Sequence, residues 1–164
     1  MIAQQLQFSC RNGILLAFAL MMGACSSNVE KPDYPTGRYD GSSNVGHTAA
    51  HIALQQVGVP YQYGGQSPSG FDCSGLVQYA YQRAGKAVPR TTGQLWSSTR
   101  TVERNSMRPG DVLFFSISGK MSHVGLYLGD GRFVHAPSTG KTVSVESLAS
   151  TYYANAFIKA GRPQ

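Results

Sequence analysis

The segment 71–77, Phe-Asp-Cys-Ser-Gly-Leu-Val, limits the possible fold of this 164-residue chain more than any other feature, because it combines a helix start with a cysteine. Apolar and small residues then recur at spacings of three and four, which predicts one buried helix face: Cys73, Leu76, Val77, Ala80 and Ala84. Asp72 stands at the N-cap position, where its carboxylate can accept the first free backbone N–H groups. Gly85 follows as a typical helix stop. Cys73 is therefore expected to be the first residue of a helix.

A thiol at a helix start lies close to the positive end of the helix dipole and to unpaired N–H groups. This position can lower a cysteine pKa from about 8.5 into the range of about 3.5–7.5, which favours the nucleophilic thiolate. The negative charge of the neighbouring Asp72 opposes the effect. The chemistry therefore needs a base close to Cys73, and histidine is the residue type that we expect there.

Four further motifs accompany the cysteine in a fixed order along the chain. They are Tyr-Gln-Tyr-Gly-Gly at 61–65, Arg-Pro-Gly-Asp at 108–111, Ser-His-Val-Gly at 122–125 and Val-His-Ala at 134–136. Together they span about residues 46–162 and resemble the NlpC/P60 family of cell-wall peptidases. The resemblance implies a papain-like α+β fold, a thiol peptidase and peptidoglycan peptide stems as substrate.

Strand periodicity begins near residue 111 and predicts strands over 111–116, 123–128, 132–136, 142–145 and 154–159. Short turns separate most of these segments, so we expect an antiparallel sheet. Helices are predicted earlier, over 47–57, after Cys73 and over 93–98, with a helical turn over 146–152. Helices followed by strands give an α+β domain, in which the nucleophile's helix start packs on the sheet.

Two registers are open for the hairpin that carries His123 and His135. A two-residue turn at 130–131 puts the histidines on opposite faces of the sheet. A three-residue loop, which pairs Leu128 with Arg132, puts them on one face as diagonal neighbours about 7–8 Å apart. A slip of one residue thus decides whether a catalytic site exists.

In the second register Gly125 lies opposite His135, and a Cys-His-His set can form. Cys73 would attack a carbonyl carbon, and His123 would take the thiol proton and later protonate the leaving amine. His135 would hold the ring and tautomer of His123. The backbone N–H of Cys73 is the expected donor to the oxyanion.

Four side chains are further candidates for contacts with the substrate or the oxyanion: Tyr61, Asp72, Ser74 and Arg90. The family resemblance implies that Tyr61 lines the site and helps to hold the oxyanion, whereas packing of its own loop is the alternative. Arg90 could bind a substrate carboxylate or tie its loop to Asp72, and we favour the structural role.

Other classes of function use the same residues. Cys73, His123 and His135 could be three zinc ligands, with water as the fourth. No carboxylate is evident as an activating partner, and a cysteine at a helix start suits a nucleophile, so we expect neither a metal nor another cofactor. A thiol amidase or acyltransferase of related fold, and a non-catalytic wall-binding lipoprotein, are the remaining alternatives.

The first 24 residues have the pattern of a signal peptide, with an apolar stretch over 13–24 that is too short to span a membrane. The following Cys25 ends a sequence that resembles a lipobox, although Met22 stands where leucine is commoner. An ordinary signal peptide cleaved after Ala24 is the alternative. Residues 25–45 are expected to be the lipidated cysteine and a flexible tether, and 46–164 the catalytic domain.

The cysteines and the net charge limit the compartments in which the protein can work and the partners that it can bind. Cys10 lies in the signal segment and Cys25 would carry lipid, so Cys73 is left as the one thiol of the domain and no intramolecular disulfide is possible. The net charge of +6 fits solubility or attraction to an anionic polymer, but no run of Lys and Arg predicts nucleic-acid binding. We expect a monomer that a lipid anchor holds in the cell envelope. Ser26 favours the outer membrane, facing the periplasm.

The resemblance leaves two bonds open as the target. Family members that cut between D-glutamate and the diamino acid often carry an extra amino-terminal domain. Residues 26–45 are too few and too polar to fold as such a domain. We therefore expect cleavage of the crosslink between two stems, with the D-glutamyl bond as the alternative.

Overall fold

The computed structural model describes residues 45–164, so the predicted signal peptide, Cys25 and the tether up to residue 44 lie outside the described residues. Helices α1 (Val45–Leu54), α2 (Cys73–Arg83) and α3 (Thr92–Ser98) come before most of the sheet. A short helix, α4 (Thr151–Ala156), precedes the last strand. The predicted α+β class is confirmed. No helix within this range is long and apolar enough to cross a membrane.

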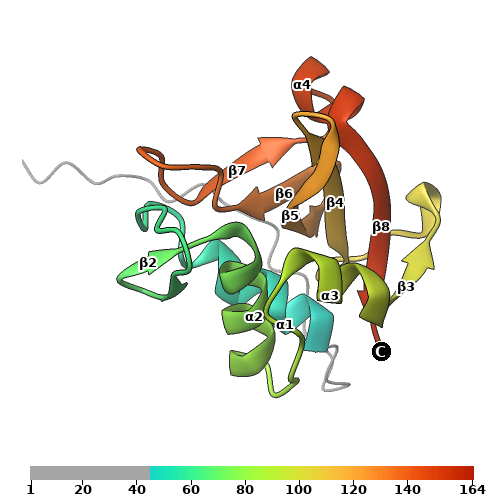
Figure 1. Cartoon of the computed structure of the whole chain (residues 1–164). Helices are drawn as coiled ribbons and strands as arrows, with labels where there is room; N and C mark the ends of the chain where they lie inside the picture. The colour runs from blue at the N-terminus through green and yellow to red at the C-terminus, as the bar shows by residue number, and fades with distance from the viewer. Residues whose placement is uncertain (1–44) are drawn as a thin grey trace, which may run out of the picture. The chain divides into compact units, whose positions relative to one another are not determined.

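Six strands form one antiparallel sheet in the order β3-β8-β4-β5-β6-β7 (Figure 1). Their bounds are β3 (Thr99–Val102), β4 (Val112–Ile117), β5 (Lys120–Gly129), β6 (Arg132–His135), β7 (Ser144–Ser147) and β8 (Phe157–Pro163). Strands β4 to β7 form a meander, whereas β8 returns to lie between β3 and β4. A small hairpin of β1 (Gln66–Ser67) and β2 (Gly70–Phe71) precedes α2, and a 3-10 turn, η1 (Arg104–Ser106), follows β3.

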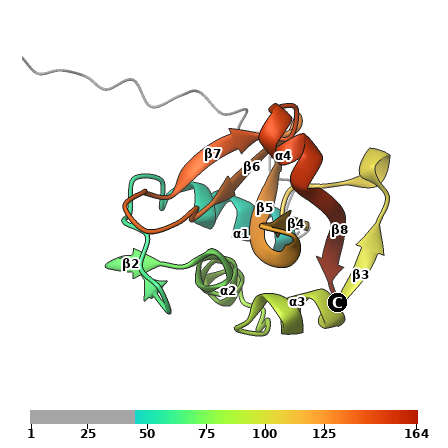
Figure 2. The ribbon, with the colours of Figure 1, turned by 45° about the horizontal axis from the view of Figure 1, so that its top comes forward.

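The sheet separates two apolar clusters, because neighbouring residues of a strand point to opposite faces. In β4, Val112 and Phe114 join the cluster formed with α1, α2 and α3, whereas Leu113 and Phe115 join the cluster beside α4. Figures 1 and 2 both show α1, α2 and α3 gathered together and α4 apart from them. The nucleophile's helix and the sheet face beside α4 thus belong to different layers.

Helix α2 begins and ends where the sequence predicts. Asp72 is its N-cap and accepts the backbone N–H of Gly75 at 2.6 Å. At the other end Gly85 has a φ of 88°, and the N–H of Lys86 donates to the carbonyl of Tyr81. This is the bonding of a Schellman motif, which glycine favours because it adopts positive φ without strain.

Several predicted boundaries are wrong. The helical turn predicted over 146–152 lies later, as α4, and the strand predicted from residue 154 begins only at Phe157. Helix α1 ends at Leu54, where the chain turns toward Gly58, whose φ is 93°. The sequence pattern predicts neither β3 nor the β1–β2 hairpin. These strands have two to four residues each, and β1 and most of β3 are not buried, so they carry little apolar alternation to reveal them.

Candidate active site

The middle of the β5–β6 ladder follows the register that brings the two predicted catalytic histidines together. Leu126 pairs with Val134, and Tyr127 pairs with Phe133. Because side chains alternate along a strand, both histidines lie on the face that carries Tyr127 and Phe133. This is the face beside α4.

The turn of this hairpin is not the predicted three-residue loop. Asp130 and Gly131 form a two-residue turn with φ values of 52° and 70°, and Gly129 pairs with Arg132. In a ladder without a bulge, such a turn would put the two histidines on opposite faces of the sheet. A β-bulge next to Gly129 shifts the ladder by one residue and restores the productive register. The bulge therefore sets the register, rather than the loop.

The two histidines are in direct contact. Nε2 of His123 lies 2.7 Å from Nδ1 of His135, and the two side chains are 7% and 0% exposed. Gly125 makes this approach possible, because a Cβ built on it would lie 2.7 Å from the Phe133 ring and 3.3 Å from Cβ of His135. The space above this glycine is thus filled by its neighbours.

Burial controls the protonation of both rings. It lowers the pKa of His123 to about 4, and together with the charge of His123 it lowers the pKa of His135 to about 3. Both imidazoles are therefore neutral near neutral pH, and each carries one N–H. For His123 to accept a proton on Nδ1, its Nε2–H must donate to Nδ1 of His135. The remaining proton then lies on Nε2 of His135.

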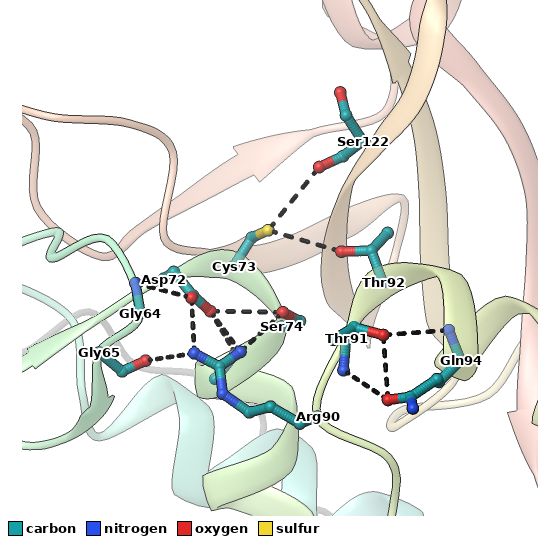
Figure 3. Close-up of polar contacts among 11 residues, drawn as sticks. Gly64, Gly65, Asp72, Cys73, Ser74, Arg90, Thr91, Thr92, Gln94 and Ser122 are labelled. Atoms are coloured by element: carbon teal, nitrogen blue, oxygen red, sulfur yellow. Dashed lines mark hydrogen bonds and ion pairs between the residues drawn. The ribbon is translucent and has the colours of Figure 1, made fainter.

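The thiol of Cys73 lies at the first turn of α2, pointing away from Arg90 (Figure 3). Its sulfur is 4.0 Å from Oγ1 of Thr92 and 4.0 Å from the carbonyl oxygen of Ser122, which precedes His123 on β5. Cys73 and His123 line the same cavity. The nucleophile and the predicted base, which come from different layers, thus share one solvent-accessible space.

The pKa of Cys73 moves in the direction opposite to the one predicted from the helix start. Burial raises it most, and the negative charge of Asp72 raises it further. Hydrogen bonds to the backbone of Val124 and Ser74 and to the Thr92 hydroxyl lower it, but they do not outweigh burial. The resting state is therefore a neutral thiol beside a neutral imidazole, and the thiol needs a proton acceptor when it attacks.

The candidates Asp72, Ser74 and Arg90 form a structural cluster behind the thiol (Figure 3). Arg90 donates to the two carboxylate oxygens of Asp72 at 2.9 and 2.6 Å and to Oγ of Ser74 at 2.9 Å. Asp72 also accepts the backbone N–H of Gly64 at 3.0 Å. None of the three side chains lines the cavity beside Cys73. Their contacts hold the start of α2 in place, which is the structural role that we favour for Arg90. The three side chains do not form part of the cavity wall.

Tyr61 lines the cavity of about 580 Å³ that Cys73 and His123 share. Its backbone N–H donates to the carbonyl of Lys141 at 2.9 Å, and it forms a bridge with Phe71 just before the nucleophile. Burial and the nearby Cys73 raise the pKa of its hydroxyl, which therefore stays protonated and able to donate. This volume lies within the range of about 300–1,000 Å³ that is typical of ligand-binding clefts.

Three polar side chains near the site were missed. Thr92 is close to the sulfur of Cys73, and the hydroxyls of Ser144 and Tyr153 lie 3.5 and 3.4 Å from Nε2 of His135. Nothing in their sequence spacing links them to the motifs, because α3, β7 and α4 reach the site only through the tertiary fold. The N-cap position of Thr91 before Thr92 was the one available local signal.

The zinc alternative finds no support in the arrangement of the donors. Within residues 45–164 no group of three or more His, Cys, Asp or Glu side chains is placed to hold a metal ion. Nε2 of His123 and Nδ1 of His135 face one another at 2.7 Å, which is the distance of a hydrogen bond between the two rings.

Comparison with known proteins gives the same assignment as the motifs. The model of the NlpC/P60 family matches residues 58–162. The chain is 42% identical over 125 residues to the probable endopeptidase YafL of Escherichia coli K12, covering 73% of this chain and 50% of the relative. It is 40% identical over 120 residues to the murein DD-endopeptidase MepH of the same organism, covering 70% and 44%. A gamma-DL-glutamyl hydrolase of Bacillus subtilis is 39% identical over 142 residues, covering 80% and 34%. The chain thus spans half or less of the length of these relatives.

Solved structures of similar proteins have the same fold. An NlpC/P60 family protein from Bacillus cereus superposes with a TM-score of 0.67 at 29% identity, covering 71% of this chain and 39% of the other. The NlpC/p60 domain of the peptidoglycan hydrolase SagA gives 0.62 at 34% identity, covering 71% and 97%. The motifs, the fold and these comparisons together show that this chain belongs to the NlpC/P60 family.

Proposed function

We propose that this chain is a cysteine peptidase that hydrolyses peptide bonds in bacterial peptidoglycan. The observation that carries the proposal is that Cys73 and His123 share one cavity while Nε2 of His123 lies 2.7 Å from Nδ1 of His135. The names of similar proteins support the substrate class, since they include a murein DD-endopeptidase and a peptidoglycan hydrolase.

The reaction follows the logic of a nucleophile, a base and an orienting residue. The sulfur of Cys73 attacks the carbonyl carbon of the scissile bond while Nδ1 of His123 takes the thiol proton. The oxyanion is held by the backbone N–H of Cys73 and by the hydroxyl of Tyr61. His123 then protonates the leaving amine, and a thioester remains. Water attacks the thioester with His123 as base, which releases the acid and restores the thiol.

The resting pair is neutral, so His123 becomes charged only as the attack proceeds. At that moment its Nε2–H donates to Nδ1 of His135 as a charge-assisted hydrogen bond, which is stronger than a neutral one. This bond stabilises the imidazolium that the buried site otherwise disfavours. His135 therefore acts as a positioning residue.

Digestion of purified muropeptides, analysed by mass spectrometry, tests the proposal. Cys73→Ala and Cys73→Ser should abolish hydrolysis while circular dichroism shows a folded protein. Iodoacetamide should inactivate the protein and a chelator should not. Inhibition by a chelator that zinc reverses would instead favour the metal alternative.

We propose the D-alanyl crosslink as the bond that is cut. The similarity to a murein DD-endopeptidase supports this target, whereas the similarity to a gamma-DL-glutamyl hydrolase keeps the D-glutamyl bond as a second candidate. The protein should convert crosslinked dimeric muropeptides into monomers. Persistence of the dimers while free stem peptides are cut at the D-glutamyl bond would reverse the assignment.

We further propose that Cys25 carries a lipid that anchors a monomeric protein to the outer membrane, facing the periplasm. The lipobox-like sequence around Cys25 and the apolar stretch before it support this proposal. Cys25→Ala should abolish palmitate labelling and release the protein from the membrane fraction. A variant that remains with the membranes would show that the anchor lies elsewhere.

A further inference from the structure

The ring of His135 is held on the side that faces away from His123 by side chains from β7 and α4. Its Nε2 lies 3.5 Å from Oγ of Ser144 and 3.4 Å from the hydroxyl of Tyr153. The rings of Tyr153 and His135 meet edge to face, with centroids 5.3 Å apart and an interplanar angle of 90°. His135 is fully buried, so these hydroxyls take the place that water would have at an exposed nitrogen.

Glu146 belongs to the same wall. It lies two residues after Ser144 on β7, so both side chains point to one face, and both line the cavity together with Tyr153. Glu146 also pairs with Phe133, whose ring contacts that of Tyr153. Burial, and after it the negative charge of Glu146, raises the pKa of the Tyr153 phenol to about 12.

We propose that Glu146 and Tyr153 position the catalytic pair: the carboxylate orients the Tyr153 hydroxyl so that its oxygen accepts Nε2–H of His135, which reserves Nδ1 of His123 for the thiol proton. The inference rests on the proposed function and adds a fourth and a fifth residue behind the Cys-His-His set. Ser144 supports the same tautomer as a second acceptor.

The direction of the Tyr153 hydroxyl is the decisive point. A phenol can donate to or accept from an imidazole nitrogen. If Tyr153 donated to Nε2 of His135, the proton of His135 would move to Nδ1 and donate to His123. The proton of His123 would then lie on Nδ1, and the thiol would find no acceptor. The negative charge of Glu146 attracts the hydroxyl proton and leaves the oxygen lone pairs for Nε2–H, which prevents this outcome.

A carboxylate thereby supports the neutral His135: the charge of Glu146 acts on Tyr153 through space, and hydrogen-bond distances link Tyr153 to His135 and His135 to His123. Other groups of the cavity wall that carry or can acquire a charge are Lys141, Tyr61, Tyr152 and Cys73. Within the described residues, the ring nitrogens of His135 have His123, Ser144 and Tyr153 at hydrogen-bond distance and none of these four.

The first test reads the tautomers directly. Long-range ¹H–¹⁵N spectra of the full-length protein with Cys73→Ala should show His123 and His135 both protonated on Nε2. A proton on Nδ1 of His123 would overturn the proposal. Because the measurement needs no substrate, it remains valid even if the protein hydrolyses no muropeptide, and so separates failure of this inference from failure of the proposed function.

The second test is a double-mutant cycle read by the rate at which iodoacetamide alkylates Cys73. Tyr153→Phe removes one hydrogen bond and keeps the ring, so the rate near neutral pH should fall roughly three- to tenfold. Glu146→Ala should slow the reaction at least as much, because the freed hydroxyl can turn and donate to His135. The double variant should be no slower than Tyr153→Phe alone, since the harmful hydroxyl is then absent.

Tyr79→Phe provides the matched control, because this tyrosine lies on α2 and its ring contacts Phe71 rather than His135. It should leave the alkylation rate and its pH profile unchanged. Additive losses in the double variant, or a wild-type rate in Tyr153→Phe, would overturn the proposal. If Tyr153→Phe does not fold, Ser144→Ala decides by the same rate, and an unchanged rate together with Nδ1–H on His123 rejects the inference.

Discussion

At the scale of single residues, one cause acts in opposite directions on the nucleophile and the base. Burial raises the pKa of Cys73 and lowers the pKa of His123 to about 4, so it disfavours the charged form of each. In the resting site, the thiol of Cys73 and the imidazole of His123 are therefore both neutral. Hydrogen bonds from the backbone of Val124 and from the Thr92 hydroxyl favour the thiolate and so lower the pKa of Cys73, which partly offsets the effect of burial.

The histidines make stability depend on pH. Their folded pKa values of about 4 and about 3 lie below the ordinary value of 6.5, so the unfolded chain binds more protons between these limits. The free energy of unfolding should be highest above 6.5 and should fall as the pH decreases, by up to about 1.4 kcal/mol per pH unit for each imidazole. Urea unfolding across this range measures the slope. His135→Asn should give a shallower slope, and an equal slope would contradict the assignment.

The role of His135 can be separated from proton transfer. An asparagine side chain can accept the Nε2–H of His123, whereas alanine cannot. His135→Asn should therefore retain measurable muropeptide hydrolysis, and His135→Ala should lose more. The initial rates of the two folded variants provide the comparison. Equal and complete loss in both would show that His135 itself transfers a proton.

At the scale of elements, the start of α2 is held by a close approach of backbone to backbone. A Cβ on Gly75 would collide with the carbonyl oxygen of Gly65, the residue whose carbonyl also accepts from Arg90 at 3.4 Å. The glycine lets the loop lie against the first turn of the helix. Asp72 can then cap α2 while its carboxylate binds Arg90.

Gly75→Ala should destabilise the domain although alanine is normally the better helix former by about 1 kcal/mol. The collision with Gly65 must move the loop or the helix start, and the thiol of Cys73 moves with it. Gly93→Ala is the matched control, because Gly93 lies within α3 with open space around its Cα. Thermal unfolding should show a lower midpoint for the first variant and an equal or higher one for the second. The reverse order would refute the close-packing argument.

At the scale of the whole domain, the last strand, β8, lies between β3 and β4 and joins them into one sheet. Asp111, which directly precedes β4, is 2% exposed and accepts hydrogen bonds from Nε and a terminal nitrogen of Arg162 at 2.7 and 2.8 Å. It also accepts the backbone N–H of Arg108 at 2.8 Å. The Arg-Pro-Gly-Asp motif thus serves the architecture rather than the cavity.

Arg162→Met should cost about 3 kcal/mol of unfolding free energy, since it leaves a buried carboxylate without its partner. Arg100→Met on the neighbouring strand is the control, because Arg100 is exposed, and its effect should stay within about 0.5 kcal/mol. Chemical unfolding of both variants tests the comparison. Equal effects would mean that the ion pair contributes no more than a surface charge.

The sequence by itself determined the local features: the capped helix with Cys73 at its start, the Gly85 stop and the antiparallel strands. These depend on spacings of a few residues, which local sterics and hydrogen bonding control. The sequence left the β5–β6 register open between two alternatives, and the choice lies in a bulge that no turn motif signals.

Only the tertiary structure decided how the pieces act together. The helix start predicts a lowered pKa for Cys73, but in the folded protein the pKa is raised. The reason is that desolvation of the buried thiol outweighs the favourable effect of the helix start on the thiolate. The contacts of Thr92 with the sulfur and of Ser144 and Tyr153 with His135 join segments far apart in the chain. Such contacts carry no sequence period, since they arise when α2, α3 and α4 pack around one sheet.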